Sequence, residues 1–397
     1  MDGTRFIVAG TLIDGSGAEA RRNVFLAVKD GMITAIGSAA DLPRHDGALV
    51  DDFSHCTIVP ALVDCSVSLM QSPAVDRRVL STADEGLAEK AAMLERHIRY
   101  CHAHGVQGVA ASDDMAGLRE GYPEGLAPWN MIDLRSSGRL CQSSHSAAGN
   151  SAGGDFLKIA YSATIEEEEA PYPRLSHEEL RNILQHRGEK KAVVVANGRQ
   201  QVKEALDAGC DGSEQGYGMG ADNLRKMAEK AVLWIPSVLR AKNGLDSAGS
   251  GGSVCCRFSQ RYVAPGKAAP GAEVFWKKML AAHLAQLRLA KTLGVKTAVG
   301  TGAGSVGILH GESMVEEMKL FIKGGYSLEE TIRCASENGA GFFGMEKLGA
   351  LAVGRKATFL ITRGTAQQLP RKLAYLEGIY VAGAPSPTYR KNPVKTA

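Results

Sequence analysis

The first part of the chain alternates apolar and polar positions in the manner of β-strands. Residues 5–9 form a short apolar run, and the runs 23–28 and 32–36 flank an Asp30-Gly31 pair. An Asp-Gly pair between two such runs favours a type I′ turn, because both central residues of that turn need positive φ. The pattern therefore predicts a small antiparallel β unit at the N-terminal end.

From Thr57 onward, short apolar runs alternate with segments of helical period. This alternation indicates repeated βα units and a parallel sheet. Ser176 with Glu179, and Ser327 with Glu330, fit the capping box, so a helix is expected to begin at each serine. About eight such units over about 290 residues suit a TIM-type (β/α)8 barrel. Strands are expected at residues 57–63, 107–111, 156–160, 192–196, 232–236 and 297–300, and a helix at residues 87–104.

Strand-like runs return near the C-terminus, at residues 357–362 and 378–382. A β unit at both ends of a barrel implies one composite domain built from the two termini. The chain is therefore expected to be an α/β protein. Its barrel should span residues 60–348, and its small β-sandwich domain should combine residues 1–59 with residues 349–397.

Two segments have the composition of loops. Residues 247–253 (SAGSGGS) are rich in Gly and Ser, which favours a loop without regular structure. Residues 166–169 are four consecutive glutamates, and a solvated loop or helix start is the simpler interpretation than a cation site.

Composition and charge place the chain among ordinary globular proteins. Apolar residues make up 44% of its 397 residues and charged residues 22%, and the net charge of +3 is too small to favour nucleic acid or a membrane as partner. The N-terminus lacks a signal-peptide pattern, and no stretch reaches the roughly 18 apolar residues of a spanning helix. The eight cysteines show no CxxC spacing, so reduced and mostly buried thiols of a cytoplasmic protein are expected.

Seven segments carry a family resemblance when they are taken together. They are 11–17 (TLIDGSG), 28–37 (VKDGMITAIG), 58–64 (IVPALVD), 202–216 (VKEALDAGCDGSEQG), 299–304 (VGTGAG), 328–344 (ending ENGAGFFG) and 348–356 (LGALAVGRK). In this order they resemble the amidohydrolase superfamily, in its imidazolonepropionase-like and Xaa-Pro dipeptidase-like branch. The resemblance implies a barrel with a β-sandwich from both termini. It also implies hydrolysis of amide or other C–N bonds by water that a mono- or dinuclear metal centre activates.

The resemblance places most of the family's metal-ligand positions on residues that bind transition metals poorly. Two histidines of the first barrel strand correspond to Ser66 and Ser68. The histidine that follows a glutamate on the sixth strand corresponds to Gln215, which follows Glu214 here. The aspartate at the end of the last strand corresponds to Gly302. Hydroxyl and amide groups are weak zinc ligands compared with imidazole.

Two further ligand positions complete this comparison. The lysine that many relatives carboxylate to bridge two metals is retained as Lys158, in DFLKIA, and an ordinary ammonium is expected there. The histidine of the fifth strand falls on Val195, or on Asn197 if the register shifts by two residues. The resemblance thus implies a fold that was kept while its metal chemistry was lost. No cofactor is expected, and zinc or iron would be bound only if this interpretation of a degenerate site is wrong.

The barrel mouth should still hold a pocket for a small molecule. His145, in SSHSAAG, and His310, after the last strand, match positions at which relatives place histidines. With Asn197, Glu214 and Gln215 they are the candidate ligand-binding residues.

Three functions are compatible with these residues. The first is a pseudoenzyme that binds a small molecule or a partner, in a homo-oligomer or with an active paralogue. The second is a metal-independent hydrolase, in which a neutral Lys158 amine activates Ser66 or Ser68. The alternative for the two serines is that they fill space and hydrogen-bond to Lys158 and Gln215. The third is an atypical mononuclear metal hydrolase that uses His145 and His310.

Other polar groups have a structural interpretation. Cys65 points the opposite way from its two serine neighbours, because side chains alternate along a strand, and it should pack behind the barrel wall. His97, His102 and His104 are expected on the surface or at the end of a helix, where the last two complement its dipole. Asp113 suits either a substrate contact or a loop cap.

Overall fold

The structure is a computed structural model of the chain. It describes residues 4–43, 49–73, 87–113, 131–138, 140–141, 154–162, 175–249, 255–256, 259–260, 270–387 and 394–395.

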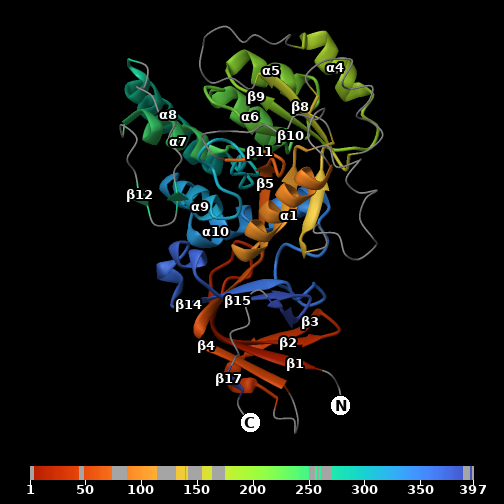
Figure 1. Cartoon of the computed structure of the whole chain (residues 1–397), viewed down its shortest axis with the longest axis vertical. Coiled ribbons are helices and arrows are strands. Elements are labelled where there is room, and N and C mark those ends of the chain that lie inside the picture. The colour runs from red at the N-terminus through yellow and green to blue at the C-terminus, as the bar shows by residue number, and fades with distance from the viewer. Residues whose placement is uncertain are drawn as a thin grey trace.

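The two ends of the chain form one mixed eight-stranded sheet, in the lower half of Figure 1. Its strands follow the order β16-β15-β14-β4-β1-β2-β3, and β17 pairs with β4. Three short 3-10 helices, η1 (Ala39–Asp41), η3 (Ala366–Gln368) and η4 (Arg371–Ala374), lie in its connections. The strands are β1 (Arg5–Leu12), β2 (Arg21–Lys29), β3 (Met32–Ser38), β4 (Leu49–Pro60), β14 (Phe359–Arg363), β15 (Leu376–Val381), β16 (Ala384–Pro385) and β17 (Val394–Lys395).

The predicted hairpin is confirmed, but the prediction of a purely antiparallel unit is wrong. Asp30 and Gly31 have φ of 51° and 77°, and β2 pairs antiparallel with β3 on either side of them. Strand β4, however, pairs parallel with β1. Two reversals return the chain to the direction of β1, and β4 then lies along the edge of β1 that β2 leaves open.

Apolar side chains pack on both faces of the terminal sheet, as the alternation along its strands requires. One face carries a core cluster that includes Ile7, Leu26 and Phe359. On the other face Phe6 and Phe25 meet edge to face, with ring centroids 6.0 Å apart.

The middle of the chain alternates parallel strands with helices, in the upper half of Figure 1. One parallel sheet has the order β5-β6-β7, with strands β5 (Leu62–Val67), β6 (Val106–Ala111) and β7 (Asp133–Ser136). The other has the order β11-β10-β9-β8, with strands β8 (Leu157–Ser162), β9 (Ala192–Ala196), β10 (Gly212–Gln215) and β11 (Leu233–Ile235). A small hairpin joins β12 (Cys255–Cys256) and β13 (Ser259–Gln260).

Helices cover these parallel strands. Both predicted capping boxes are confirmed, at Ser176 in front of α4 and at Ser327 in front of α10.

No described helix is both long and apolar enough to cross a membrane. The helices are α1 (Leu87–Ala103), α4 (His177–Gln185), α5 (Arg199–Asp207), α6 (Ala221–Glu229), α7 (Val238–Gly249), α8 (Ala272–Leu293), α9 (Ser313–Lys323), α10 (Leu328–Cys334) and α11 (Glu337–Phe343).

Several predicted boundaries need correction. The run at residues 57–63 is divided between β4 and β5, because the backbone leaves the terminal sheet at Ala61, whose N–H donates to the carbonyl of Thr358. Of the predicted loop at residues 247–253, residues 247–249 belong to α7, since packing of α7 on α8 outweighs the weak helix propensity of Gly and Ser, and residues 250–253 lie outside the described residues. The four glutamates at residues 166–169 lie outside the described residues.

The cysteines match the expectation of buried thiols where their side chains are described. Six of them are buried and form no disulfide bond: Cys56, Cys65, Cys101, Cys141, Cys210 and Cys334.

Candidate functional site

A buried ion pair lies where side chains from three parallel strands converge. Nζ of Lys158, on β8, lies 2.7 Å from Oε2 of Glu214, on β10. The hydroxyl of Ser66, on β5, donates to the other oxygen of Glu214 at 2.8 Å. The side chains of Lys158 and Glu214 are only 7% and 6% exposed, so both charges depend on each other for stabilisation.

Ser68 takes part in a separate contact at the end of β5. Its hydroxyl donates to Oδ1 of Asp113 at 2.7 Å, and the N–H groups of Leu69 and Met70 donate to the same carboxylate at 2.5 and 3.3 Å. Burial raises the pKa of Asp113, while these three donors oppose the shift. Asp113 therefore caps the loop after β5, which is one of the two roles expected for it.

Asp64 links β5 to residue 301 of the segment that follows α8. The N–H and the hydroxyl of Thr301 donate to the two oxygens of Asp64 at 2.9 and 2.6 Å. Burial raises the pKa of Asp64 to about 6, although the Thr301 donors favour the ionised form. The carboxylate is thus engaged by the backbone that leads to Gly302.

The amide side chains of Asn197 and Gln215 pair with each other. Nδ2 of Asn197 donates to Oε1 of Gln215 at 2.7 Å, and Oδ1 of Asn197 accepts from the N–H of Tyr217 at 3.0 Å. Gln215 has a positive φ of 70°, which turns the chain sharply at the end of β10. Val195 is paired in register with Glu214 and is buried. Both alternatives for the fifth-strand position therefore lie beside the end of β10.

His310 lies beside the end of β5, but its side chain is buried. Its Nε2–H donates to the carbonyl of Ser68 at 2.8 Å, and its ring stacks on His97 with centroids 3.8 Å apart. Burial, and then the neighbouring His97, lower the pKa of His310 to about 3. The other predicted histidine of the pocket, His145, lies outside the described residues.

The contacts of the two serines differ from those expected. Their hydroxyls were expected to bond to Lys158 and Gln215, whereas they donate to Glu214 and Asp113. Carboxylates are the stronger acceptors, and an ammonium accepts no hydrogen bond. In the part of the chain that the structure describes, no group of three His, Cys, Asp or Glu side chains is arranged to hold a metal ion.

The prediction for Cys65 agrees with the structure, and His102 lies in the last turn of α1 as expected, but the expectation of surface histidines is wrong for His97 and His102. A Cβ placed on Gly339 of α11 would lie 2.5 Å from Sγ of Cys65, so this side chain faces a helix behind the strand. His97 and His102 are buried rather than exposed, because α1 turns them toward backbone carbonyls. Nδ1 of His97 bonds to Leu69 O at 2.6 Å, and Nδ1 of His102 to Met131 O at 3.2 Å.

The sequence model of the amidohydrolase family matches residues 57–391. The chain belongs to the amidohydrolase family. No sequence among the curated proteins matches it.

Solved structures of amidohydrolases share its fold. One is a Xaa-Pro dipeptidase with bound methionine, 17% identical, with a TM-score of 0.75 over 96% of this chain and 99% of that one. A second is ochratoxinase from A. niger, 17% identical, with a TM-score of 0.76 over 98% of each chain. A third is a putative prolidase from Bifidobacterium longum, 18% identical, with a TM-score of 0.75 over 99% and 96% of the two chains.

Sequence reasoning missed one buried carboxylate in this member of the amidohydrolase family. Glu317, on α9, accepts from the N–H groups of Val238 and Leu239 at 2.8 and 2.6 Å, and so caps the start of α7. Burial raises its pKa to about 8. No local motif marks Glu317, because the helix it caps begins 79 residues earlier in the chain.

Proposed function

We propose that this amidohydrolase-family protein is a pseudoenzyme that binds a small molecule in the mouth of its barrel. The observation that carries the proposal is the Lys158–Glu214 ion pair, closed by Ser66. The lysine and glutamate retained from the family pattern stabilise each other instead of a metal ion. Asn197 and Gln215, whose amides pair nearby, are the proposed ligand-binding groups at the strand ends.

The proposal includes a closed eight-stranded barrel over residues 60–348 and a composite sandwich domain from residues 1–59 and 349–397. Residues 297–303 would be the eighth strand. Thr297 forms a parallel bridge with β11, and Ala303 forms one with β5. Between β7 and β8, the N–H of Asp155 donates to Ser136 O at 2.6 Å. The carboxyl ends of the strands would then meet at one mouth, where barrel active sites lie.

The residues at the family's ligand positions do not fit a transition-metal centre. Ser66 and Ser68 offer neutral hydroxyls, both donating to carboxylates. Val195 offers no donor atom, and Gly302 has no side chain. The ammonium of Lys158 places a positive charge where a divalent cation would have to bind, which would add repulsion to the weakness of the remaining donors.

Carboxylation of Lys158 is also disfavoured by its neighbour. A carbamate at this position would place a second negative charge beside Glu214 in a buried setting. Without a cation to bridge them, like charges at this distance cost several kcal/mol. We therefore propose an unmodified lysine, and we propose no cofactor.

The contacts favour this function over the two alternatives. A Ser–Lys nucleophile needs a neutral amine that accepts the hydroxyl proton. Here the Ser66 hydroxyl donates to Glu214, and the lysine amine faces the same carboxylate. An atypical metal site would need His310, whose Nε2 is turned to the backbone of Ser68.

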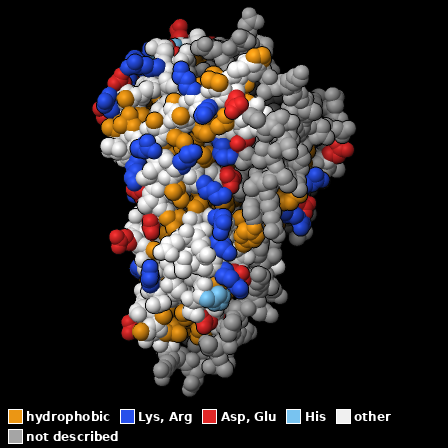
Figure 2. Space-filling view, turned by 90° about the vertical axis from the view of Figure 1, so that its left-hand side faces the viewer, with side chains coloured by type: hydrophobic (Ala, Val, Ile, Leu, Met, Phe, Trp, Pro, Cys, Tyr) orange, Lys and Arg blue, Asp and Glu red, His pale blue; other side chains and the backbone are white. Residues whose placement is uncertain are grey.

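The proposed partner is a small molecule or a protein, such as another copy of the chain or an active paralogue. The face in Figure 2 carries basic, acidic and apolar side chains interspersed, rather than one large basic area. Together with the net charge of +3, this supports neither nucleic acid nor a membrane as partner. A cytoplasmic location belongs to the same proposal.

Elemental analysis of the purified protein tests the loss of metal chemistry. Protein produced in medium supplemented with zinc, iron or manganese should contain well under one metal ion per chain. Carbon-13 NMR of the protein in labelled bicarbonate should show no signal from a carbamate on Lys158. Such a signal would be recognised by its loss in Lys158→Arg. One tightly bound metal ion per chain, or a carbamate assigned to Lys158, would overturn the proposal.

A hydrolase assay separates the remaining alternative. A panel of N-acyl amino acids and lactams should show no turnover above that of buffer. If one is hydrolysed, Lys158→Arg and Ser66→Ala should be compared with Lys203→Arg, an exposed lysine on α5. Activity lost in the first two and kept in the third would establish the metal-independent hydrolase instead.

A further inference from the structure

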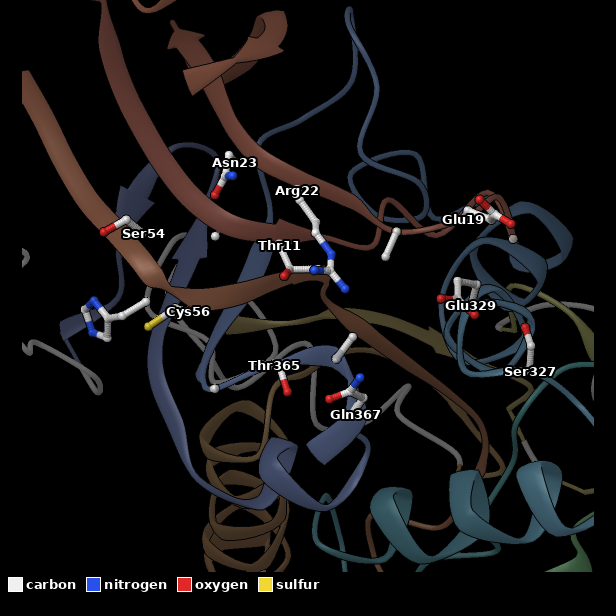
Figure 3. Close-up of a pocket in the computed structure, with 16 residues that line it drawn as sticks. Thr11, Glu19, Arg22, Asn23, Ser54, Cys56, Ser327, Glu329, Thr365 and Gln367 are labelled. Carbon is white, nitrogen blue, oxygen red and sulfur yellow. The ribbon is translucent and has the colours of Figure 1, made fainter. Parts of the chain in front are cut away.

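A cavity of about 860 Å³ lies between the terminal sheet and α10, at residues that the proposed function does not use. In Figure 3, strands of the sheet lie on one side of it and helical segments on the other. Small-molecule sites typically have volumes of about 300–1,000 Å³. The cavity therefore has room for a ligand of its own.

The register of the sheet places polar side chains in a row that ends in this cavity. Thr11 of β1 pairs with Arg22 of β2 and with Thr57 of β4, and Thr57 pairs with Thr362 of β14. Residues paired in this way point to the same face of a sheet. The hydroxyl of Thr57 donates to the carbonyl of Gly364 at 2.8 Å and does not line the cavity. Thr11 and Arg22, at the other end of the row, do line it.

An irregularity between β1 and β4 shapes the wall. Their register shifts between Ala9 and Thr11, at Gly10. A Cβ on Gly10 would collide with the carbonyl oxygen of Ser54, so only glycine allows this approach. The loop after β14 is held to the same region, because the N–H of Gly364 donates to His55 O at 3.3 Å.

Charged side chains of both signs line the cavity without neutralising each other. Within the described part of the chain, Arg22, Glu19 and Glu329 form no ion pair, although all three line this cavity. In Figure 3, Arg22 extends between Thr11 and Gln367, while Glu19 and Glu329 lie near each other on one side.

The neighbouring arginine behaves differently. Arg21 points to the opposite face of β2, and its Nη2 lies 3.5 Å from Oδ2 of Asp14. Arg21 therefore has a carboxylate partner within the chain, and Arg22 has its guanidinium free for a ligand. A guanidinium recognises a carboxylate through two parallel hydrogen bonds, and two nearby carboxylates favour an ammonium group.

We propose that this cavity binds a small zwitterion, separately from the barrel mouth. The carboxylate of the ligand pairs with Arg22, and its ammonium group pairs with Glu19 and Glu329. The hydroxyl of Thr11 and the side chains of Thr365 and Gln367 line the space between the charged ends.

Isothermal titration of the full chain with ω-amino acids, from β-alanine to 6-aminohexanoate, tests the charge pattern. The ω-amino acid that binds is then compared with the acid and the amine of the same chain length, such as hexanoate and hexylamine for 6-aminohexanoate. Each of these two compounds lacks one of the two charges. The zwitterion should bind at least about tenfold more tightly than either, because each of them lacks one of the two charge pairs; tenfold corresponds to about 1.4 kcal/mol. Equal affinity for the zwitterion and the acid, or no saturable binding by any ω-amino acid, would overturn the proposal.

Variants then assign the charges to residues. Arg22→Gln and Glu329→Gln should each weaken the zwitterion by about tenfold or more, whereas Arg21→Gln, the matched control, should leave its affinity unchanged. Arg22→Glu should shift the preference to a diamine of the same length, which a merely destabilised protein would not do. Circular dichroism and thermal melting confirm that each variant is folded. Binding that Arg22→Gln leaves intact, or that Arg21→Gln weakens equally, contradicts the assignment.

Discussion

The ammonium group of Lys158 lies 2.7 Å from Oε2 of Glu214, in a setting where both side chains are almost wholly buried. The pair joins β8 to β10, and Ser66 extends it to β5 through Oε1. Removing a charge from water is costly, and the partner's charge offsets that cost only while both are present. Removing one member of the pair is therefore expected to destabilise the fold by more than the intact pair stabilises it.

A double-mutant cycle measures this dependence. Glu214→Gln leaves a buried ammonium without its counter-charge and should lower the free energy of unfolding by about 3–5 kcal/mol. Adding Lys158→Met removes that ammonium, so the double variant should recover much of the loss in urea unfolding at pH 7.

The exposed pair of Lys203 and Asp207, 3.0 Å apart on α5, provides the control. Lys203→Met should change the free energy of unfolding by no more than about 0.5 kcal/mol. Strictly additive losses for Lys158 and Glu214 would show that the two charges do not stabilise each other.

Local signals in the sequence predicted the elements that depend on neighbouring residues. The capping boxes at Ser176 and Ser327 need only three residues of context, and both helices begin where expected. The Asp30-Gly31 turn likewise depends on φ at two positions. Position along a strand also predicted the orientation of Cys65, because alternation is a property of the strand itself.

Contacts between distant segments could not be predicted in the same way. Ser66 and Glu214 are 148 residues apart, and only the fold brings the hydroxyl to the carboxylate rather than to Lys158. His97 was expected on the surface because its helix was placed in the outer ring, away from the barrel mouth. It is buried because Leu69 O and the ring of His310 lie opposite that face of α1.

Glu317 predicts a fall in stability with rising pH. Its pKa is raised by burial to about 8 from an ordinary value of 4.5, so the folded chain keeps a proton that the unfolded chain has released. Unfolding therefore releases a proton between these two pH values, and raising the pH favours the unfolded state. The buried histidines, whose pKa values are lowered, change the free energy of unfolding only below about pH 6.5. From pH 6.5 to 8 the free energy of unfolding should fall by about 2 kcal/mol.

Urea unfolding across this pH range should isolate the contribution of Glu317. Glu317→Gln has no proton to lose and should remove the slope. Glu316→Gln, beside it on α9 and 2.6 Å from Lys319 in the native chain, should retain the slope. The same slope in both variants would place the titrating group elsewhere.

The burial of His310 predicts that the free energy of unfolding falls as the pH is lowered in the acid range. Burial and His97 lower its pKa to about 3, so the folded chain holds it neutral while the unfolded chain binds a proton below about pH 6.5. Stability from this group is present above pH 6.5 and is lost as the pH falls toward 3. His310→Gln keeps a donor for the carbonyl of Ser68 and removes the titration.

The measurement is the difference in free energy of unfolding between His310→Gln and the native protein. For each pH unit below 6.5, the stability of the variant relative to the native protein should rise by about 1.4 kcal/mol. His186→Gln serves as the control, because His186 is an exposed residue directly after α4 whose Nδ1 bonds to Asn182 O of that helix. A difference that does not vary with pH would show that His310 does not titrate in this range.

The close contact between Cys65 and Gly339 predicts a compensating pair of substitutions. A Cβ on Gly339 would lie 2.5 Å from Sγ of Cys65 and 3.1 Å from Cγ1 of Val63, so Gly339→Ala forces the strand and α11 apart. Overpacking of this kind typically costs about 1–3 kcal/mol. Cys65→Ala removes the nearer obstacle, so the double variant should melt at a higher temperature than Gly339→Ala alone. Gly341→Ala, on the same helix with open space at its Cβ, should be neutral or slightly stabilising. If Cys65→Ala gives no recovery, then Cys65 does not face α11 as the contact indicates.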